Sequence, residues 1–296
     1  MKVRLLYTEG DGNFHEKMWD KPEITSTEIE VKAVMTGVCR SDIDMMAGDF
    51  GPLPLHMQGH EGLGIVTKVG SDVIGVGEGD YVATRGEPAY ADYYNCRDGE
   101  FVVVPELHPR YILEPVACGI NCVSQAYRYF ERHSKGKCLI LGSGFLAWVA
   151  FHNIAHHFPD MSVDVLGSSN QELWGDNLLF GTSESYDIVV DLSGKYELGT
   201  EINLNNNAVI IDAVGKAVSK KEAQDQLWKA VTTIKPSPRT DEFINAMYQA
   251  RWMIENGELN VDPFWTKGYD RITEWQLAFK DGAIRPQNYS RGFIVW

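Results

Sequence analysis

A cysteine and a histidine about twenty residues apart carry the clearest chemical signal in the sequence. Cys39 opens the polar run CRSD, and His60 lies in GHE, which adds the carboxylate of Glu61. Thiolate, imidazole and carboxylate groups are the ligands that Zn²⁺ takes in mixed sites. Glu114, next to Pro115 at a change in sequence texture, offers another carboxylate. The pattern favours a zinc site over the alternative, a buried thiol and a hydrogen-bonded core histidine.

The second chemical signal is the pattern G-x-G-x-x-A, formed by Gly142, Gly144 and Ala147. It ends the apolar run 137–144 and opens a helix predicted over about 145–157. In a dinucleotide site the first glycine makes a tight turn and the second lets backbone amides approach the pyrophosphate. The small third residue permits close packing of helix on sheet. The sequence therefore predicts a nucleotide-binding turn between a strand and a helix.

The end of the next apolar run, 162–167, bears on the choice between NAD and NADP. Where an NAD site offers Asp or Glu to the ribose hydroxyls, this chain has Gly167 and Ser168, followed by Ser169. No carboxylate stands there to repel a 2′-phosphate, and hydroxyls are available to bind one, so the pattern favours NADP over NAD. The Arg or Lys that often accompanies this preference is missing. Asp164, earlier in the strand, is expected to be a solvated residue that faces outward.

The candidate metal ligands and the glycine pattern lie in regions with different predicted secondary structure. Up to about residue 105 the sequence is β-rich: residues 28–38 alternate apolar and polar side chains, and short strands punctuated by Gly, Pro and Asp follow. From about residue 113, helical segments alternate with short apolar strands such as 186–194 and 207–215, which indicates a parallel sheet covered on both faces. Residues 240–259 are expected to form a long amphipathic helix. The predicted fold class is α/β, with a β-rich half followed by a doubly wound parallel sheet.

The composition limits the class of protein and its partners. The 296 residues give a prior of roughly two domains. With 27 Lys and Arg against 41 Asp and Glu, the formal net charge is −14, which argues against nucleic-acid and anionic-membrane partners. The apolar stretch 138–151 is too short to cross a bilayer, and no secretory signal is expected at the N-terminus. Five scattered cysteines favour a reducing compartment, so a cytoplasmic location is expected.

Four motifs in order resemble those of the zinc-dependent medium-chain alcohol and polyol dehydrogenases: GVCRSD at 37–42, GHEGLG at 59–64, LEP at 113–115 and the glycine pattern at 142–147. The glutamate in LEP is more similar to the sorbitol, threonine and glucose dehydrogenase branch. The resemblance implies a GroES-like catalytic domain over 1–115, completed by 265–296, and a Rossmann coenzyme domain over 116–264. It also implies one catalytic zinc per chain and a homodimer or homotetramer.

The resemblance further implies a set of metal ligands. Cys39 and His60 would bind the zinc, and Glu61 and Glu114 would each be either a direct ligand or a partner of the metal-bound water. Zinc would act as a Lewis acid that lowers the pKa of the substrate's hydroxyl.

The same resemblance assigns roles to residues around the metal. Asp42 would orient His60, and Ser41 would pass the substrate's hydroxyl proton towards solvent. Arg40 and Arg291 match positions that contact the pyrophosphate of the cofactor.

The chain departs from the family pattern at three places. Cys96 is the only cysteine near the interval where the family has a four-cysteine structural zinc lobe. Asp44 stands where many members have a relay histidine. The loops are shorter, notably between Ser168 and Tyr186, on the adenine side of the coenzyme pocket.

The function implied is hydride transfer between NADP(H) or NAD(H) and a small alcohol or polyol, or its carbonyl. One alternative is a zinc-free quinone or enone reductase, which would need neither Cys39 nor His60. Another is a non-catalytic descendant that binds nucleotide as a sensor or structural protein. Candidates for contact with the substrate are Phe50, His56 and Trp265.

Overall fold

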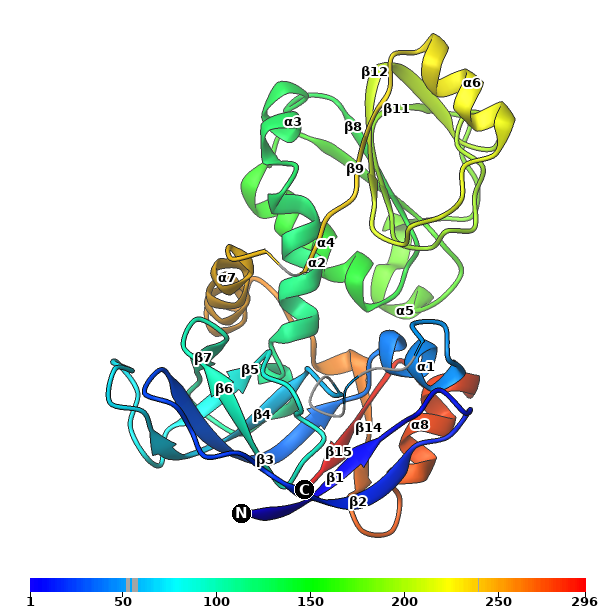
Figure 1. Cartoon of the computed structure of the whole chain (residues 1–296). Helices are drawn as coiled ribbons and strands as arrows, with labels where there is room; N and C mark the ends of the chain where they lie inside the picture. Colours follow the sequence, from blue (N-terminus) through cyan, green and yellow to red (C-terminus); the bar gives the residue numbers. More distant parts are fainter. Residues whose placement is uncertain (52–53, 55–57, 239) are drawn as a thin grey trace. The chain divides into compact units, whose positions relative to one another are not determined.

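The computed structural model describes residues 1–51, 54, 58–238 and 240–296. They form two compact units, each built around its own sheet (Figure 1). Unit 1 comprises Met1–Ala117 and Met247–Trp296, and unit 2 comprises Cys118–Ala246. This division assigns residues 247–264 to unit 1, whereas the boundary expected from the sequence places them with the coenzyme domain.

The main sheet of unit 1 has seven strands within the described residues, in the order β14-β15-β3-β4-β5-β7, with β6 also paired to β3. Neighbours are antiparallel except β14 and β15, which are parallel. The strands are β3 (Glu28–Gly37), β4 (Gly62–Val69), β5 (Tyr81–Thr84), β6 (Tyr93–Arg97), β7 (Phe101–Val103), β14 (Trp265–Asp270) and β15 (Arg291–Val295). A separate antiparallel hairpin pairs β1 (Lys2–Tyr7) with β2 (His15–Asp20). The β-rich first half is confirmed.

Strand β3 illustrates why this region forms a sheet. Ile29, Val31 and Ala33 alternate along it and are buried, whereas Lys32 between them is exposed. The buried side chains pack in one core with residues of β4, β5 and β6. The period-two pattern of the sequence is therefore realised as one apolar face.

Two helices of unit 1, α1 (Arg40–Ala47) and α8 (Trp275–Ile284), pack against each other. The contact is close because Gly282 of α8 has no side chain: a Cβ there would lie 3.2 Å from side-chain atoms of Val38 and Ile43. The described residues of the unit also form the 3₁₀ turns η2 (Pro109–Tyr111) and η4 (Asp262–Phe264). Helix α1 begins directly after Cys39, so the packing of α8 helps to fix the start of the candidate site.

The sheet of unit 2 is parallel throughout, in the order β10-β9-β8-β11-β12-β13. Its strands are β8 (Lys137–Leu141), β9 (Ser162–Leu166), β10 (Leu178–Leu179), β11 (Ser185–Asp191), β12 (Asn203–Asp212) and β13 (Thr232–Ile234). This order places β8 and β11 side by side at the point where successive strands change direction across the sheet. Ligands of such sheets bind at that point, next to the carboxyl ends of the strands. The Rossmann-type parallel sheet is confirmed.

The helices of unit 2 are α3 (Tyr127–Arg132), α4 (Phe145–His157), α5 (Gln171–Trp174) and α6 (Lys220–Trp228), with the 3₁₀ turn η3 (Gly175–Asn177). Two further helices, α2 (Glu114–Ser124) and α7 (Phe243–Glu255), cross the unit boundaries in sequence. The predicted long helix at 240–259 is thus shorter than expected. It ends before Gly257, whose backbone has φ +74°, a left-handed conformation that stops a helix.

Both faces of the parallel sheet are buried, but they are covered differently. Cys138 and Ile140 of β8 pack with α2, α3 and α4, whereas Leu139 and Leu141 face a second core. That second core includes Leu198, Ile202 and Leu204 from the chain around the start of β12. The connection 192–202 between β11 and β12 contains no helix, so an irregular segment covers part of this face.

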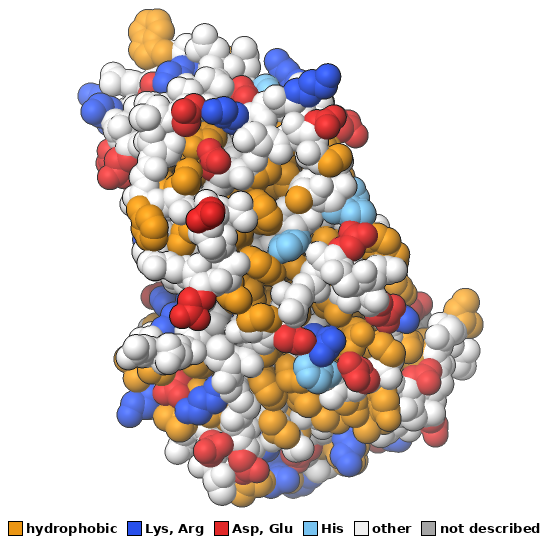
Figure 2. Space-filling model, turned by 180° about the vertical axis from the view of Figure 1, so that it is seen from behind, with side chains coloured by type: hydrophobic (Ala, Val, Ile, Leu, Met, Phe, Trp, Pro, Cys, Tyr) orange, Lys and Arg blue, Asp and Glu red, His pale blue; other side chains and the backbone are white. Residues whose placement is uncertain are grey.

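No helix in the described part of the chain is long and apolar enough to cross a membrane. Figure 2 shows acidic and basic side chains interspersed over one face of the molecule, with apolar side chains between them. The charges on this face do not gather into a large patch of one sign.

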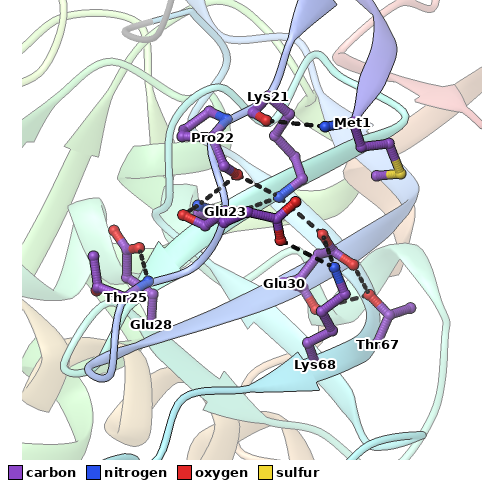
Figure 3. Close-up of polar contacts among 10 residues, drawn as sticks. Met1, Lys21, Pro22, Glu23, Thr25, Glu28, Glu30, Thr67 and Lys68 are labelled. Carbon is purple, nitrogen blue, oxygen red and sulfur yellow. Dashed lines mark hydrogen bonds and ion pairs between the residues drawn. The ribbon is translucent and has the colours of Figure 1, made fainter.

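A buried ion pair fixes the segment that follows β2 onto the main sheet (Figure 3). Nζ of Lys21 lies 2.8 Å from Oε2 of Glu30, and the two side chains are 1% and 4% exposed. The ammonium group also donates to the Pro22 carbonyl and to Asn95, and Thr67 donates to Glu30. Burial raises the pKa of Glu30, but the hydrogen bonds of Lys21 and Thr67 and the charge of Lys21 outweigh it, so the pKa is lowered.

We expect Lys21→Ala to lower the free energy of unfolding by about 3–5 kcal/mol, because it leaves the Glu30 carboxylate buried without its main partner. Lys68→Ala is the control, since Lys68 reaches the same carboxylate at 3.4 Å from a side chain that is 46% exposed. That change should cost less than about 1 kcal/mol. Urea denaturation measures both values. Equal losses in the two variants would contradict this account of the pair.

Candidate functional site

The turn after β3 and the segment before β4 bring the candidate metal ligands together in unit 1. Thr36 of β3 is paired with Gly62 of β4, and the amide of Gly37 donates to the carbonyl of Glu61 at 2.9 Å. Cys39, just after β3, and His60, just before β4, therefore lie at the same end of the sheet. Residues distant in sequence meet because the two strands are antiparallel neighbours.

Three donor atoms converge at this point. The Sγ of Cys39, one ring nitrogen of His60 and one carboxylate oxygen of Glu61 all lie within 4.8 Å of one another. Cys39 and His60 are half-buried, and Glu61 is fully buried. A thiolate, an imidazole and a carboxylate form the mixed donor set that suits Zn²⁺. The residues present therefore fit a zinc ion.

Asp42 supports this arrangement through hydrogen bonds with its neighbours. It is 1% exposed, and its Oδ2 accepts hydrogen bonds from the amide of Cys39 at 2.8 Å and the hydroxyl of Tyr90 at 2.7 Å. Its Oδ1 lies 3.8 Å from Nδ1 of His60. The Oγ of Ser41 lies 3.5 Å from Nε2 of the same histidine. Both ring nitrogens of His60 thus face residues of the turn at the start of α1.

Glu61 is joined to Arg291, the first residue of β15. Nη2 of Arg291 lies 2.5 Å from each carboxylate oxygen of Glu61. The side chain of Glu61 is 0% exposed and that of Arg291 is 12% exposed. The ring of Trp265 lies 5.0 Å from the guanidinium carbon. The structure therefore provides a buried ion pair beside Cys39 and His60, a contact that the sequence does not indicate.

The charges around His60 set its protonation in the protein without a metal ion. Burial lowers the pKa of His60, but the charges of Glu114 and Asp42 and the hydrogen bond with Cys39 raise it well above its ordinary value. Burial and the charge of Glu61 raise the pKa of the Cys39 thiol, and His60 partly opposes them. A metal ion that binds here must displace protons from both groups.

Glu114, the first residue of α2, is buried at 4% exposure. It is not a member of the group whose donor atoms all lie within 4.8 Å of one another, among the described residues. Its effect on the pKa of His60 nevertheless shows that it acts on the site electrostatically.

Gly37 and Tyr90 are two residues of this site that sequence reasoning did not single out. A Cβ at Gly37 would lie 2.0 Å from Oε2 of Glu61, so only glycine leaves room for that carboxylate. Tyr90 donates to Asp42 and also to the carbonyl of Gly37 at 3.1 Å. Gly37 belongs to the GVC motif and could have been identified from the sequence, whereas Tyr90 lies in no motif.

Other residues proposed from the sequence lie at the surface of unit 1. Arg40 is exposed and its Nε lies 2.7 Å from Oδ1 of Asp44, the residue found in place of a relay histidine. Phe50 is 57% exposed. His56 lies outside the described residues.

The glycine turn of unit 2 has the geometry that the sequence predicts. Gly142 has φ +113°, a conformation that other residues rarely adopt. Gly144 is the residue before α4, and a Cβ there would have open space around it. Ala147 is buried against the sheet. The first turn of α4 therefore leaves its backbone amides next to an open approach, as an anion site requires.

The loop after β9 contains Gly167, Ser168 and Ser169, and both serines are exposed. Asp164 differs from expectation: it is half-buried, and its Oδ2 accepts a hydrogen bond from the hydroxyl of Tyr186 at 2.9 Å. Tyr186 belongs to β11, which is separated from β9 by β8 in the sheet, so Asp164 has a hydrogen-bond partner two strands away and does not face solvent alone.

Comparison with known proteins agrees with this architecture. Residues 25–119 match the alcohol dehydrogenase GroES-like domain. The chain is 39% identical over 84 residues to an alcohol dehydrogenase of Moraxella sp., a match that covers 28% of this chain and 25% of that protein. It is 27% identical to the D-arabitol-phosphate dehydrogenase of Enterococcus avium, with 87% of each chain covered. The matched region thus spans about a quarter of the length of the curated alcohol dehydrogenases that it matches.

Solved structures extend the likeness to the whole fold. Staphylococcus aureus TarJ in complex with NADPH has a TM-score of 0.78 at 15% identity, covering 100% of this chain and 99% of that one. A zinc-binding dehydrogenase from Sinorhizobium meliloti bound to NADP has a TM-score of 0.75 at 16% identity, covering 100% of both chains. At these identities the likeness establishes the fold alone.

We expect Gly37→Ala to weaken zinc binding by about 10–100-fold without altering any candidate ligand, because the new methyl group displaces the Glu61 carboxylate. A competitive titration against a chromophoric zinc chelator measures the affinity. Gly181→Ala is the matched control, since a Cβ at that position meets nothing within 4 Å. Unchanged zinc affinity in folded Gly37→Ala protein would show that Glu61 does not need its observed position.

Proposed function

We propose that the chain is a zinc-dependent oxidoreductase of the medium-chain dehydrogenase/reductase family, a proposal supported by the GroES-like domain match and the shared fold. The proposed reaction transfers a hydride between NADP(H) and a small alcohol or polyol, or the corresponding carbonyl compound. The observation that carries this proposal is the convergence of Cys39, His60 and Glu61 donor atoms within 4.8 Å. A site with these three donors has the composition of a catalytic zinc centre that keeps a position open.

Cys39 and His60 are the proposed zinc ligands, with Glu61 and Glu114 as the candidate carboxylate ligands. Bound zinc would supply Lewis-acid chemistry to the oxygen of the substrate. The pair of Glu61 with Arg291 gives the carboxylate a second role, because a carboxylate held by an arginine can stay ionised in a buried place without ligating the ion.

Two residues of the first turn of α1 have proposed roles in orientation and proton transfer. Asp42, held by Tyr90 and the amide of Cys39, orients His60. Ser41, with its hydroxyl 3.5 Å from His60, moves the hydroxyl proton of the substrate towards solvent. Asp44 is paired with Arg40 and so does not extend this route in the way a histidine would.

The proposed cofactor is NADP, in preference to NAD. Gly142, Gly144 and Ala147 would receive the pyrophosphate at the start of α4, and Arg40 and Arg291 are its proposed side-chain contacts. The loop Gly167, Ser168 and Ser169 offers hydroxyls and no carboxylate to the 2′ position of the ribose.

We also propose a cytoplasmic location and a homodimer or homotetramer. The location is supported by five free cysteines, of which three are buried. The assembly rests on resemblance to the family.

Cys39→Ser and His60→Ala should each lower kcat/KM by about 10³-fold or more, because each removes a proposed zinc ligand. The affinity for NADPH should stay within about threefold of the unaltered protein. Steady-state assays over a panel of alcohols and carbonyl compounds, together with NADPH fluorescence titration, measure the two effects. Cys118→Ser, another half-buried cysteine, is the control and should keep its activity. Full activity in both ligand variants would exclude the proposed chemistry.

Zinc content measured by elemental mass spectrometry should be about one ion per chain, because only one group of mixed donors is found among the described residues. The protein should be purified without chelators or metal-affinity resin. A chain that binds NADPH but contains no zinc would favour a zinc-free reductase or a nucleotide sensor.

A further inference from the structure

Ser143, between the two glycines of the nucleotide-binding turn, is buried and bonded to the loop after β9. It is 3% exposed. Its Oγ accepts a hydrogen bond from the amide of Ser169 at 2.9 Å and lies 3.0 Å from Oγ of the same residue. The hydroxyl therefore ties the pyrophosphate turn to the segment proposed to meet the ribose.

The carbonyl of Ser143 reinforces this connection. It accepts hydrogen bonds from Nδ2 of Asn170 at 2.9 Å and from Nε1 of Trp174 at 3.0 Å. Asn170 has φ +55°, a left-handed conformation that costs free energy unless its surroundings hold it. Trp174 is buried and packs edge-to-face on Trp148 and Phe151 of α4. The hydroxyl and the carbonyl of Ser143 thus join the loop and α5 to the start of α4.

The same serine determines what position 167 can hold. A Cβ at Gly167 would lie 2.4 Å from Oγ, 2.6 Å from Cβ and 2.9 Å from the amide nitrogen of Ser143. No side chain fits there while Ser143 keeps its place. The other carboxylate of this strand, Asp164, accepts the hydroxyl of Tyr186. A ribose-binding carboxylate at the end of β9 is therefore excluded sterically as well as by the sequence.

We infer that Ser143 is a specificity-determining residue for the phosphorylated cofactor. Its bulk keeps position 167 free of a carboxylate, and its hydroxyl holds Ser168 and Ser169 ready for the 2′-phosphate. The inference rests on the proposed NADP-dependent function and adds a positioning residue to it.

The physical reason is preorganisation. A loop that is already ordered loses less conformational entropy when it binds a ligand. Ser168 and Ser169 are exposed, and the hydroxyls of such residues can donate to phosphate oxygens. NADH lacks the 2′-phosphate, so loosening this loop affects NADPH far more than NADH.

The test measures dissociation constants of NADPH and NADH by fluorescence titration of the full chain. Ser143→Ala should raise the NADPH value about tenfold and the NADH value less than threefold, since one or two hydrogen bonds to the loop are lost. Ser124→Ala is the matched control, because that hydroxyl donates to the Asn121 carbonyl within α2. The control should leave the ratio of the two constants unchanged.

The steric half of the inference is tested by Gly167→Asp with and without a compensating change. Alone, Gly167→Asp should weaken both cofactors and lower the thermal midpoint, because the new side chain collides with Ser143. Combined with Ser143→Gly, the aspartate should bind the ribose hydroxyls and tighten NADH binding about tenfold relative to the single variant. An equally poor single and double variant would overturn this half.

Equal weakening of NADPH and NADH by Ser143→Ala would show a general structural role and overturn the inference while leaving the proposed function intact. If thermal unfolding shows that this variant does not fold, Asn170→Ala carries the same prediction for the ratio, because it removes a bond to the Ser143 carbonyl and leaves Ser168 and Ser169 unchanged. Failure of the unaltered protein to bind either cofactor would overturn the proposed function, and this inference with it.

Discussion

A buried carboxylate that requires a cation organises unit 1. Glu61 is fully buried, and an ionised carboxylate without a partner in such a place costs several kcal/mol. Arg291 supplies the partner because β15 pairs with β3 in a register that sets Phe293 opposite Gly37. The same register brings Val38 against Gly292 through a backbone hydrogen bond. The geometry around Cys39 therefore depends on the pairing of β15 with β3.

In each unit a glycine makes room for a buried polar side chain. At Gly37 the missing side chain makes room for the carboxylate of Glu61, and at Gly167 it makes room for the hydroxyl of Ser143. In both places the buried polar group packs directly against the backbone of a glycine, and other residues form hydrogen bonds with it. A buried polar group without partners would destabilise the unit, so glycine and polar residue act as a pair.

The sequence predicted the local elements well and the long-range contacts poorly. The alternation in β3 and the strand–glycine–helix order at Gly142 have short-range signatures, and both were predicted correctly. The family resemblance brought Cys39, His60 and Glu61 together, and the structure places them within 4.8 Å. The pairing of Arg291 with Glu61 and of Tyr90 with Asp42 depends on strand register between distant segments, which no local pattern encodes. Asp164 was misread because its partner, Tyr186, lies on another strand.

Unit 1 is formed by two stretches of chain, and the whole of unit 2 lies between them in sequence. On the ribosome, residues 118–246 emerge before β14 and β15 exist, so the parallel sheet can fold while the sheet of unit 1 still lacks these two strands. Until β15 is synthesised, Glu61 has no Arg291 and that end of β3 is paired with β4 on one side only. The order of synthesis therefore delays completion of the candidate metal site until after residues 118–246 have emerged. Nascent chains halted before residue 291 would hold an open strand edge beside the Cys39 thiol.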